Sequence, residues 1–533
     1  MKKIYLMLIV LIVAVTSCTD QFADFNTDKK NPAVVPGESL FSNSQKELSD
    51  YINNTNVNIN IFKLVSQYWT ETTYIDEVNY DLITRNISTD IYSRVYLRVL
   101  KDLKESAQVI SGTDVLASQE PVKQNKLQII ELMNVYTYLQ LVDVFGNIPY
   151  SQALEVNNVY PKYDDAATIY KDLFKRVDAA LAKLDVTSDG FGPADLYYGG
   201  DVASWIKFGN SLKIRMGITV ADASDADLQA TAKAAVESGA SNCFASNDDD
   251  CLLKYLTSSP NYNQLYVDLV ATGRHDFVAA NTIVDVLNNL GDPRIMSYFT
   301  YPVTFPFATN ALGANKDTTV TAGRGMYVYY KNIANKDSIV YKTTPFTLSG
   351  KNDSLVKVIL GGQYGYSNSY SQASHIAAAI QKPEFPGIML TYTEIQFYLA
   401  EAKERGYNVP KTAEEYYNEG IKSSFDFWGT PGVEAYLAKP EVAYTTASGT
   451  WKQKIGVQSW IANYTRGLEG YNTWRRLDYP IFNIPSMKTS YADIPVRFTY
   501  PVNEQTLNEV NYKAASAAIG GDLMTTKLFW DKY

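Results

Sequence analysis

Three segments of the chain mix aromatic side chains with hydrogen-bonding side chains, a combination suited to binding a neutral oligosaccharide. Sugar rings stack their apolar faces on aromatic rings, and their hydroxyl groups pair with carboxylate, amide and guanidinium groups. The residues that we predict to contact such a ligand are Trp69, Tyr74, Asp76, Tyr80 and Arg85 in the first segment, Tyr262, Tyr266 and Arg274 in the second, and Tyr364, Tyr366 and Asn368 in the third. The alternative explanation for each segment is core packing of the same rings.

The charge and the aromatic content of the chain agree with a neutral ligand. The 533 residues include 48 Lys and Arg against 57 Asp and Glu, which gives a formal net charge of −9. This balance produces no positive field, so nucleic acids and anionic membrane surfaces are not expected as electrostatic partners. The chain has 41 Tyr against 21 Phe, and the tyrosine side chain suits both wet binding surfaces and half-buried contacts.

The sequence contains none of the common motifs for catalysis or metal binding. It has no phosphate loop, no paired CxxC, no HExxH and no GxSxG. Its two histidines, His275 and His375, exclude a histidine-rich metal centre, and the acidic run at 248–250 lacks the ligand spacing of a calcium loop. The absence of these motifs removes most of the support for nucleotide-binding and zinc-protease functions, and we predict no catalytic residue, metal or cofactor. A glycoside hydrolase is the less favoured alternative, because helical hairpins that carry a loop-rich insert are a scaffold for presenting a binding surface, although the sequence does not allow a pair of carboxylates to be selected or excluded.

The first 17 residues are predicted to be a secretory signal peptide. Lys2 and Lys3 precede an apolar run at 4–15 that is too short to span a membrane as a helix. Small residues then lead to Cys18, in an arrangement that resembles the lipobox of bacterial lipoproteins, in which the cysteine is acylated and becomes the new N-terminus. We expect residues 18–36 to be a flexible tether through which the lipid holds the folded body on a membrane.

Cys243 and Cys251 are the two cysteines that follow the predicted lipidation site. Outside the cytosol, two thiols this close in the sequence either form a disulfide or are buried separately. The sequence does not decide between these alternatives. Two isolated cysteines do not make a metal-binding or redox motif.

Helical periodicity dominates the first 240 residues. At 164–184, for example, apolar residues recur at the spacing of one helix face. The helices predicted in this part of the chain are 40–51, 59–71, 89–110, 126–145, 164–184 and 203–220. The segment 246–387 is instead rich in Gly, Pro, Asn, Ser and Tyr, with short β-like runs at 327–330 and 356–360.

Helical character returns after residue 387. Thr391 with Glu394, and Thr412 with Glu415, have the spacing of a capping box, in which a hydroxyl and a carboxylate satisfy free amides at a helix start. The two helices that follow are predicted to form an antiparallel hairpin of tetratricopeptide-like dimensions. A further helical stretch is predicted at 452–474, and 480–501 is predicted to be a loop.

These patterns predict a mainly α fold over residues 37–533, and the chain length leaves the number of domains open. Its helical scaffold is expected at 37–245 and 388–480. The loop-rich, partly β segment at 246–387 is expected to be an insert that faces the ligand, and 481–533 is expected to be a C-terminal segment.

Five local sequences carry a resemblance to the SusD/RagB family of outer-membrane nutrient-binding lipoproteins. They are Asp143-Val-Phe-Gly-Asn-Ile-Pro-Tyr150, Trp205-Ile-Lys-Phe-Gly-Asn-Ser-Leu-Lys-Ile-Arg215, the stretch 391–406, Arg466-Gly-Leu-Glu-Gly-Tyr-Asn-Thr-Trp-Arg-Arg476 and Tyr500-Pro-Val-Asn-Glu504. Together with the lipobox and the helix pairs, they cover almost the whole mature chain in the order of the family.

The resemblance implies a single SusD-like domain over residues 37–533, built as an α-α superhelix of tetratricopeptide-like hairpins with an irregular region that forms most of the ligand surface. It also implies a lipoprotein on the cell surface that binds glycans and delivers them to a SusC-like TonB-dependent outer-membrane barrel. A peptide ligand, as in the RagB branch, is the alternative. The five local sequences match structural motifs of the helices, so they transfer no ligand-binding residue to this chain.

Overall fold

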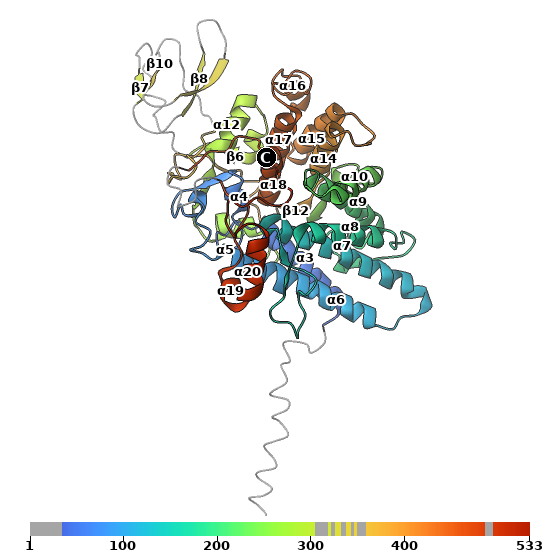
Figure 1. Ribbon diagram of the computed structural model, residues 1–533. Helices are drawn as coiled ribbons and strands as arrows, with labels where there is room; N and C mark the ends of the chain where they lie inside the picture. The colour runs from blue at the N-terminus through green and yellow to red at the C-terminus, as the bar shows by residue number, and fades with distance from the viewer. Residues whose placement is uncertain are drawn as a thin grey trace, which may run out of the picture.

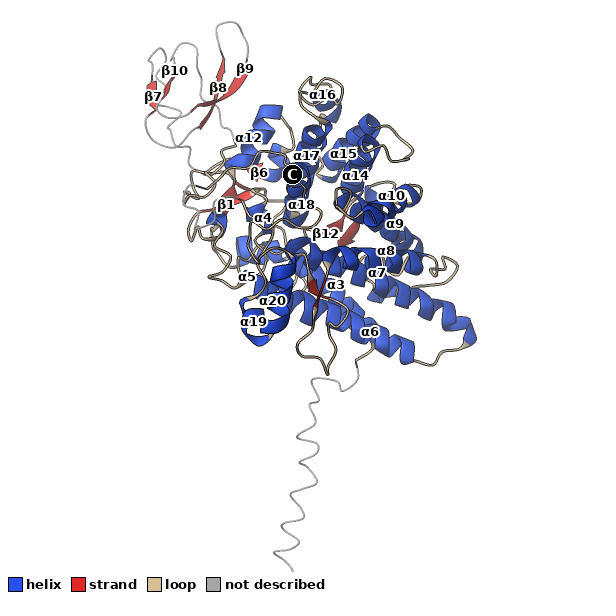
Figure 2. Ribbon diagram, in the orientation of Figure 1, coloured by secondary structure: helices blue, strands red, loops and turns tan. Residues whose placement is uncertain are grey.

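The computed structural model describes residues 35–303, 359–485 and 494–532, together with four strands at 318–320, 326–331, 337–342 and 346–348. The predicted signal peptide, Cys18, most of the predicted tether and residues 356–358 of the second β-like run lie outside the described residues. Helices make up most of the described chain (Figure 1 and Figure 2), as predicted. Within the described part of the chain, no helix combines the length and the apolar content needed to cross a membrane.

The N-terminal part of the helical body confirms most of the predicted helices. Its α-helices are α3 (Gly37–Asn53), α4 (Phe62–Val65), α5 (Ile87–Arg94), α6 (Lys101–Gly112), α7 (Glu120–Phe145), α8 (Ala166–Leu181), α9 (Val202–Thr219) and α10 (Ala226–Gly239). The π-helical turn η2 (Val95–Leu100) joins α5 to α6, so the helix predicted at 89–110 is continuous. Asp165, Asp201 and Asp225 cap α8, α9 and α10, each accepting the amide of the third following residue.

The C-terminal part contains the predicted hairpin and further short helices. Its helices are α14 (Tyr392–Glu404), α15 (Ala413–Phe427), α16 (Val433–Leu437), α17 (Trp451–Ala462), α18 (Gly467–Leu477), α19 (Val502–Leu507) and α20 (Glu509–Ala518). Helices α14 and α15 pack together closely, and a Cβ on Gly420 of α15 would lie 2.9 Å from the Phe397 ring of α14. The stretch predicted at 452–474 is two helices, because the chain turns between Ala462 and Gly467.

The two predicted capping boxes differ in the structure. Thr412 accepts the Glu415 amide at 3.2 Å, and the Glu415 carboxylate accepts the Thr412 amide at 2.7 Å, so this box is complete. Thr391 accepts the Glu394 amide at 3.2 Å, but the Glu394 carboxylate pairs with Arg466 at 2.5 Å. The box at Thr391 and Glu394 is therefore half formed, because the buried Arg466 guanidinium binds the Glu394 carboxylate.

The prediction of one helix over 59–71 is wrong. Helix α4 occupies only Phe62–Val65, Gln67 has a positive φ of 57°, and the chain then enters strand β1 (Trp69–Glu71). Strand β1 pairs in antiparallel register with β5 (Phe277–Ala279). A partner this distant in sequence leaves no signal in the local apolar pattern, which is why the helical period was misleading.

The segment 246–387 combines short helices with two-stranded antiparallel sheets. Its helical turns are α11 (Gln264–Tyr266), the π-helical η6 (Val267–Ala271), α12 (Asn281–Leu290) and α13 (Ile295–Tyr298). Strand β4 (Cys251–Leu253) pairs with β12 (Gly387–Leu390), β6 (Phe299–Thr300) with β11 (His375–Ile376), β7 (Thr318–Val320) with β10 (Phe346–Leu348), and β8 (Met326–Lys331) with β9 (Asp337–Lys342). The β4–β12 pair brings the two ends of the segment together.

Elsewhere, β2 (Ile148–Pro149) pairs with β3 (Tyr163–Asp164), and the 3₁₀ turns are η1 (Glu77–Asn79), η3 (Ala117–Gln119), η4 (Gly192–Ala194) and η5 (Asn247–Asp249).

Aromatic side chains fix the position of β1 on the helical body. The Tyr68 hydroxyl donates to the Trp460 carbonyl of α17 at 2.5 Å, and the Trp460 indole donates to the Ser66 carbonyl at 3.0 Å. Both rings are fully buried and lie 4.9 Å apart. The chain that leaves β1 therefore starts from a rigid point of the core.

Candidate ligand-binding pocket

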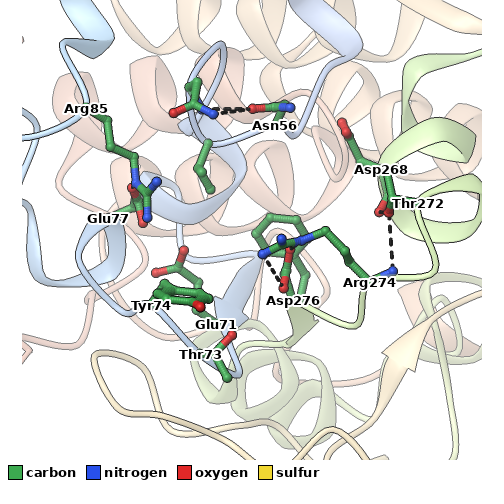
Figure 3. A pocket seen from close by; sticks show the side chains of 13 residues that line it. Asn56, Glu71, Thr73, Tyr74, Glu77, Arg85, Asp268, Thr272, Arg274 and Asp276 are labelled. Carbon is green, nitrogen blue, oxygen red and sulfur yellow. Dashed lines mark hydrogen bonds and ion pairs between the residues drawn. The ribbon is translucent and has the colours of Figure 1, made fainter.

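A pocket of about 320 Å³ lies where the chain after α3, the chain around β1 and the chain before β5 meet (Figure 3). Its lining residues are Asn56, Val57, Asn58, Glu71, Thr73, Tyr74, Glu77, Arg85, Asp268, Thr272, Arg274, Asp276 and Phe277. Three of the predicted ligand contacts, Tyr74, Arg85 and Arg274, are brought together here from two of the three predicted segments. The lining is mostly polar, which suits a ligand that forms hydrogen bonds.

Tyr74 presents an exposed ring at this pocket. The residue is 68% exposed, and its backbone φ of 53° lies in the left-handed region that tyrosine rarely adopts. Gln67, Tyr80 and Asn86 of the same segment also have positive φ values, of 57°, 65° and 52°. Unfavourable backbone conformations of this kind persist only where surrounding contacts enforce them, and they concentrate at functional sites.

Asparagine side chains enforce the conformation of the segment around Tyr74. The Asn79 amide donates to the carbonyls of Ile75 at 2.7 Å and Gly365 at 3.1 Å. The Asn368 amide donates to the carbonyl of Glu71 at 3.0 Å. Asn368, which we predicted as a ligand contact, therefore holds its own segment against β1 instead of lining the pocket.

Both arginines of the lining are paired with carboxylates. Arg85 forms an ion pair with buried Glu77, and its guanidinium lies 3.8 Å from the exposed Asp76 carboxylate. Arg274 donates to Asp276 through two nitrogens, one of them at 3.1 Å. Because both positive charges are balanced locally, the pocket is suited to an uncharged ligand more than to an acidic one.

Glu71 and Glu77 form a buried carboxyl pair at the inner side of the pocket. Glu71 is 2% exposed and Glu77 is fully buried. Burial, followed by the charge of Glu77 and a hydrogen bond with it, raises the pKa of Glu71 well above its ordinary value of 4.5. Burial also raises the pKa of Glu77, against the lowering effects of Glu71 and Arg85. The pair therefore holds a proton at neutral pH.

This shared proton makes stability depend on pH. The folded protein keeps a proton that the unfolded chain releases near pH 4.5, so the free energy of unfolding falls as the pH rises above that value. Replacing Glu71 by the neutral isostere Gln should remove this dependence, while its side-chain oxygen still accepts the Val78 amide, which Glu71 binds at 3.2 Å. Between pH 5 and pH 8, the native protein should lose up to about 1.4 kcal/mol per pH unit more than Glu71→Gln. Urea unfolding across this range measures the difference.

Exposed Glu434→Gln is the control for the Glu71→Gln variant. If the unfolding free energies of Glu71→Gln and of the native protein change in parallel with pH, the shared proton is contradicted.

Three predicted ligand contacts belong to the core. Trp69, Tyr80 and Tyr364 are each at most 2% exposed. The Tyr364 hydroxyl donates to the Leu64 carbonyl at 2.9 Å, and the Gln67 amide donates to the Tyr80 hydroxyl at 3.2 Å. Core packing, the stated alternative, accounts for these rings, so we no longer propose them as ligand contacts.

The other predicted residues lie outside the pocket lining. Asp76 is exposed, with its carboxylate 3.8 Å from the Arg85 guanidinium, and Tyr366 is half-buried in the segment that Asn368 holds. Tyr262 and Tyr266 are half-buried and meet edge to face, with ring centroids 5.3 Å apart. None of these four residues lines the described pocket.

Several lining residues were missed by the sequence analysis. Asn56 and Asn58 lie in the asparagine-rich run 53–60, whose composition signals a loop but not its position. Glu71, Asp268 and Asp276 gave no signal of their own, because acidic residues are common throughout the chain. The pairing of β1 with β5 brings Glu71 next to Asp276, and a hydrogen bond from the Thr55 amide to Asp268 holds the asparagine-rich run beside them.

The two cysteines are separate thiols in the structure. Cys251 is buried in β4 and Cys243 is half-buried, and neither forms a disulfide. Burial raises the pKa of Cys243 to about 11.

The acidic run at 248–250 makes contacts within the fold. Asp249 binds Lys207 at 2.7 Å, and Asp250 accepts the Tyr392 amide at 2.6 Å.

Comparison with known families identifies the group to which this fold belongs. The chain matches the SusD-like family described as starch-binding associating with outer membrane, over residues 29–337 and 341–501. The chain belongs to this family. No curated protein sequence matches it.

Solved structures of SusD-like proteins share the fold. A chitin-binding protein is 24% identical, with a TM-score of 0.73, and the match covers 93% of this chain and all of the other. A SusD homologue from Bacteroides uniformis is 21% identical, with a TM-score of 0.70 and coverage of 93% and 99%. A chitin-binding SusD homologue from Flavobacterium johnsoniae is 21% identical, with a TM-score of 0.68 and coverage of 93% and 97%.

Four of the five sequences that resemble SusD-like proteins contribute charged side chains to buried ion pairs. Arg215 lies 2.8 Å from Glu469 and 3.8 Å from Asp143, and Arg476 binds Glu401 at 2.7 Å and 2.8 Å. All five residues are almost fully buried. These family sequences therefore hold the scaffold together, as expected, and lie apart from the pocket lining.

Proposed function

We propose that this protein binds a neutral glycan in the pocket beside Tyr74 and delivers it to a SusC-like TonB-dependent outer-membrane barrel. The observation that carries the proposal is an exposed tyrosine ring, held by a constrained loop, beside a polar pocket whose two arginines are already paired. The family description names starch binding and association with the outer membrane, and two similar structures are described as chitin-binding. These names support a glycan as the ligand class.

The protein is proposed to act on the cell surface as a lipoprotein. Lipidation of Cys18 attaches the body to the outer membrane, and the transporter receives the ligand there. The family description supports the membrane association.

Binding without cleavage is the chemistry that the pocket carboxylates favour. A glycosidase places its two carboxyl groups about 5 to 9.5 Å apart, on either side of the scissile bond. Glu71 and Glu77 are instead both buried, and they lie close enough together to shift each other's pKa. We therefore propose that they fix the shape of the pocket and do not act on the ligand.

Replacing Tyr74 by Ala should weaken glycan binding about tenfold, because one aromatic stack contributes roughly 0.5–1.5 kcal/mol beyond burial. Folding should be unaffected, since the ring is exposed. The measurement is retardation of the unlipidated protein in gels that contain starch, chitin oligosaccharides or other plant, host and microbial glycans, followed by calorimetry and by chromatography of the recovered ligand.

Tyr160→Ala is the matched control, because Tyr160 is also an exposed tyrosine, at 57%, outside the pocket. Equal affinity of Tyr74→Ala and the native protein would remove Tyr74 from the site. Binding of casein peptides alone would replace the glycan by a peptide ligand, and shortened glycan after incubation would indicate a hydrolase.

A further inference from the structure

Five large apolar side chains protrude from one end of the molecule. Val156, Val159 and Tyr160 lie on the loop between β2 and β3, Leu507 ends α19, and Val510 is on α20. They are exposed by 91%, 74%, 57%, 68% and 81%, respectively. We call these five residues the apolar tip. A single exposed apolar residue needs no explanation, but a group of this kind marks an interaction surface.

Hydrogen bonds join the loop and the two helices into one surface. The Asn511 amide donates to the Tyr160 carbonyl at 3.0 Å, and the Asn508 amide donates to the Pro161 carbonyl at 2.9 Å. The Tyr163 hydroxyl donates to Glu504 of α19 at 2.9 Å. The tip is therefore a fixed feature of the fold.

Two ion pairs flank the apolar tip, whose loop also carries the exposed Lys162. Lys104 lies 2.8 Å from Glu155, and Lys513 lies 2.5 Å from Glu509. These two pairs cancel, and Lys162 in the loop and Glu504 on α19 carry opposite charges, so the tip presents apolar side chains within a rim that is close to neutral. This composition fits a contact made by burial of apolar surface, without electrostatic attraction.

The tip lies beside the place where the described chain begins. The Ser106 hydroxyl of α6 donates to the Gly37 carbonyl at the start of α3, at 2.7 Å. Lys104, on the same helix, donates to the Leu154 carbonyl of the tip loop at 2.8 Å. Helices α19, α20 and α6 are all at the lower end of the molecule in Figure 1, whereas β1, which borders the pocket, is higher in Figure 2.

The length of chain before this point limits how far the body is from its anchor. From Cys18 to Val35 the backbone reaches at most about 60 Å when fully extended. A lipid on Cys18 therefore enters the bilayer within that distance of the end of the molecule that carries the tip.

We propose that the apolar tip rests in the surface of the bilayer that holds the Cys18 lipid. This inference relies on the lipid anchor in the proposed function. Tyrosine is enriched at the level of the headgroups, where its ring and hydroxyl are both satisfied, and Val and Leu side chains are stabilised just beneath them. The contact turns the pocket side of the molecule away from the membrane, toward the medium from which a glycan arrives.

The test uses the full lipidated protein in vesicles of uncharged phosphatidylcholine. Val159→Cys is labelled with an environment-sensitive fluorophore, while the native thiols are buried or half-buried. The matched control is Met296→Cys, since Met296 is 49% exposed on α13, which packs on α12 at the other end of the molecule (Figure 1). We expect iodide quenching of the Val159 label to fall about fivefold when the protein enters vesicles, and quenching of the Met296 label to be unchanged.

A second variant tests the surface without moving the anchor. In the lipidated protein labelled at Val510→Cys, the additional change Val159→Asp should restore iodide quenching to the level of the vesicle-free protein, because a carboxylate disfavours insertion. Its retention by glycan gels should be unchanged, which separates failure of this inference from failure of the binding proposal.

Three outcomes would overturn the inference. The first is equal quenching of the Val159 label with and without vesicles. The second is protection that appears only after an outer-membrane barrel protein is added, which would assign the tip to a protein partner. The third is failure of the lipidated protein to float with vesicles to a greater extent than Cys18→Ala.

Discussion

Replacing Trp69 by Ala should lower the free energy of unfolding by about 3–5 kcal/mol. The indole is fully buried, donates to the Tyr464 hydroxyl at 2.9 Å and lies 6.1 Å from the Phe277 ring of the partner strand β5. Its removal leaves a cavity at the start of β1 and takes a donor from a buried hydroxyl. The loss is measured by urea unfolding followed by circular dichroism.

Tyr74→Ala is the control for this prediction, because its ring lies nearby in sequence but is exposed. Its unfolding free energy should change by no more than about 0.5 kcal/mol. The two variants thus separate the core role of Trp69 from the ligand role proposed for Tyr74. A Trp69→Ala protein as stable as the native one, but with weaker glycan binding, would reverse our assignment.

Replacing Arg466 by Met should also cost about 3–5 kcal/mol of unfolding free energy. The Arg466 guanidinium binds Glu394 at 2.5 Å and the Met389 carbonyl at 2.7 Å, and it lies 3.8 Å from Glu469. All three of these partners are at most 4% exposed. The substitution removes the positive charge that balances the buried Glu394 carboxylate. Denaturant unfolding at pH 7 measures the effect.

A second substitution tests the cause. Glu394→Gln, introduced together with Arg466→Met, removes the uncompensated charge and should recover at least half of the lost stability. The same Glu394→Gln change made alone should destabilise the protein, because it weakens a charged pair. If the double variant is as unstable as the sum of the two single variants, the loss comes from packing and not from the charge.

The helical part of the fold could be predicted because its signals are local. The apolar spacing at 164–184 corresponds to α8, and the reciprocal pair Thr412 and Glu415 starts α15 as expected. Both signals operate within one or two helix turns, so neighbouring residues contain the information. At 59–71 the same reasoning failed, because β1 depends on a partner that enters only at β5.

The candidate site shows more clearly what could not be predicted from the sequence. Tyr74 and Tyr80 lie in one segment and both have positive φ values, yet Tyr74 is 68% exposed and Tyr80 is 1% exposed. Tyr80 is covered by Gln67 and by Tyr364, whose ring centroid lies 6.2 Å away. Both residues are tyrosines in the same loop-like segment, so the sequence pattern does not show which of them is exposed.

The sequence by itself determined the helical class, the positions of most helices, the resemblance to SusD-like proteins and a mixture of aromatic and polar residues that suits the binding of sugars. These properties depend on residue type and on spacing along one element. Only the tertiary structure decided which rings are exposed, that Arg85 and Arg274 share one pocket, and that burial beside Glu77 raises the pKa of Glu71. Burial and charge pairing are sums over neighbours that the chain brings together from distant positions, and so they are fixed only when the chain has folded.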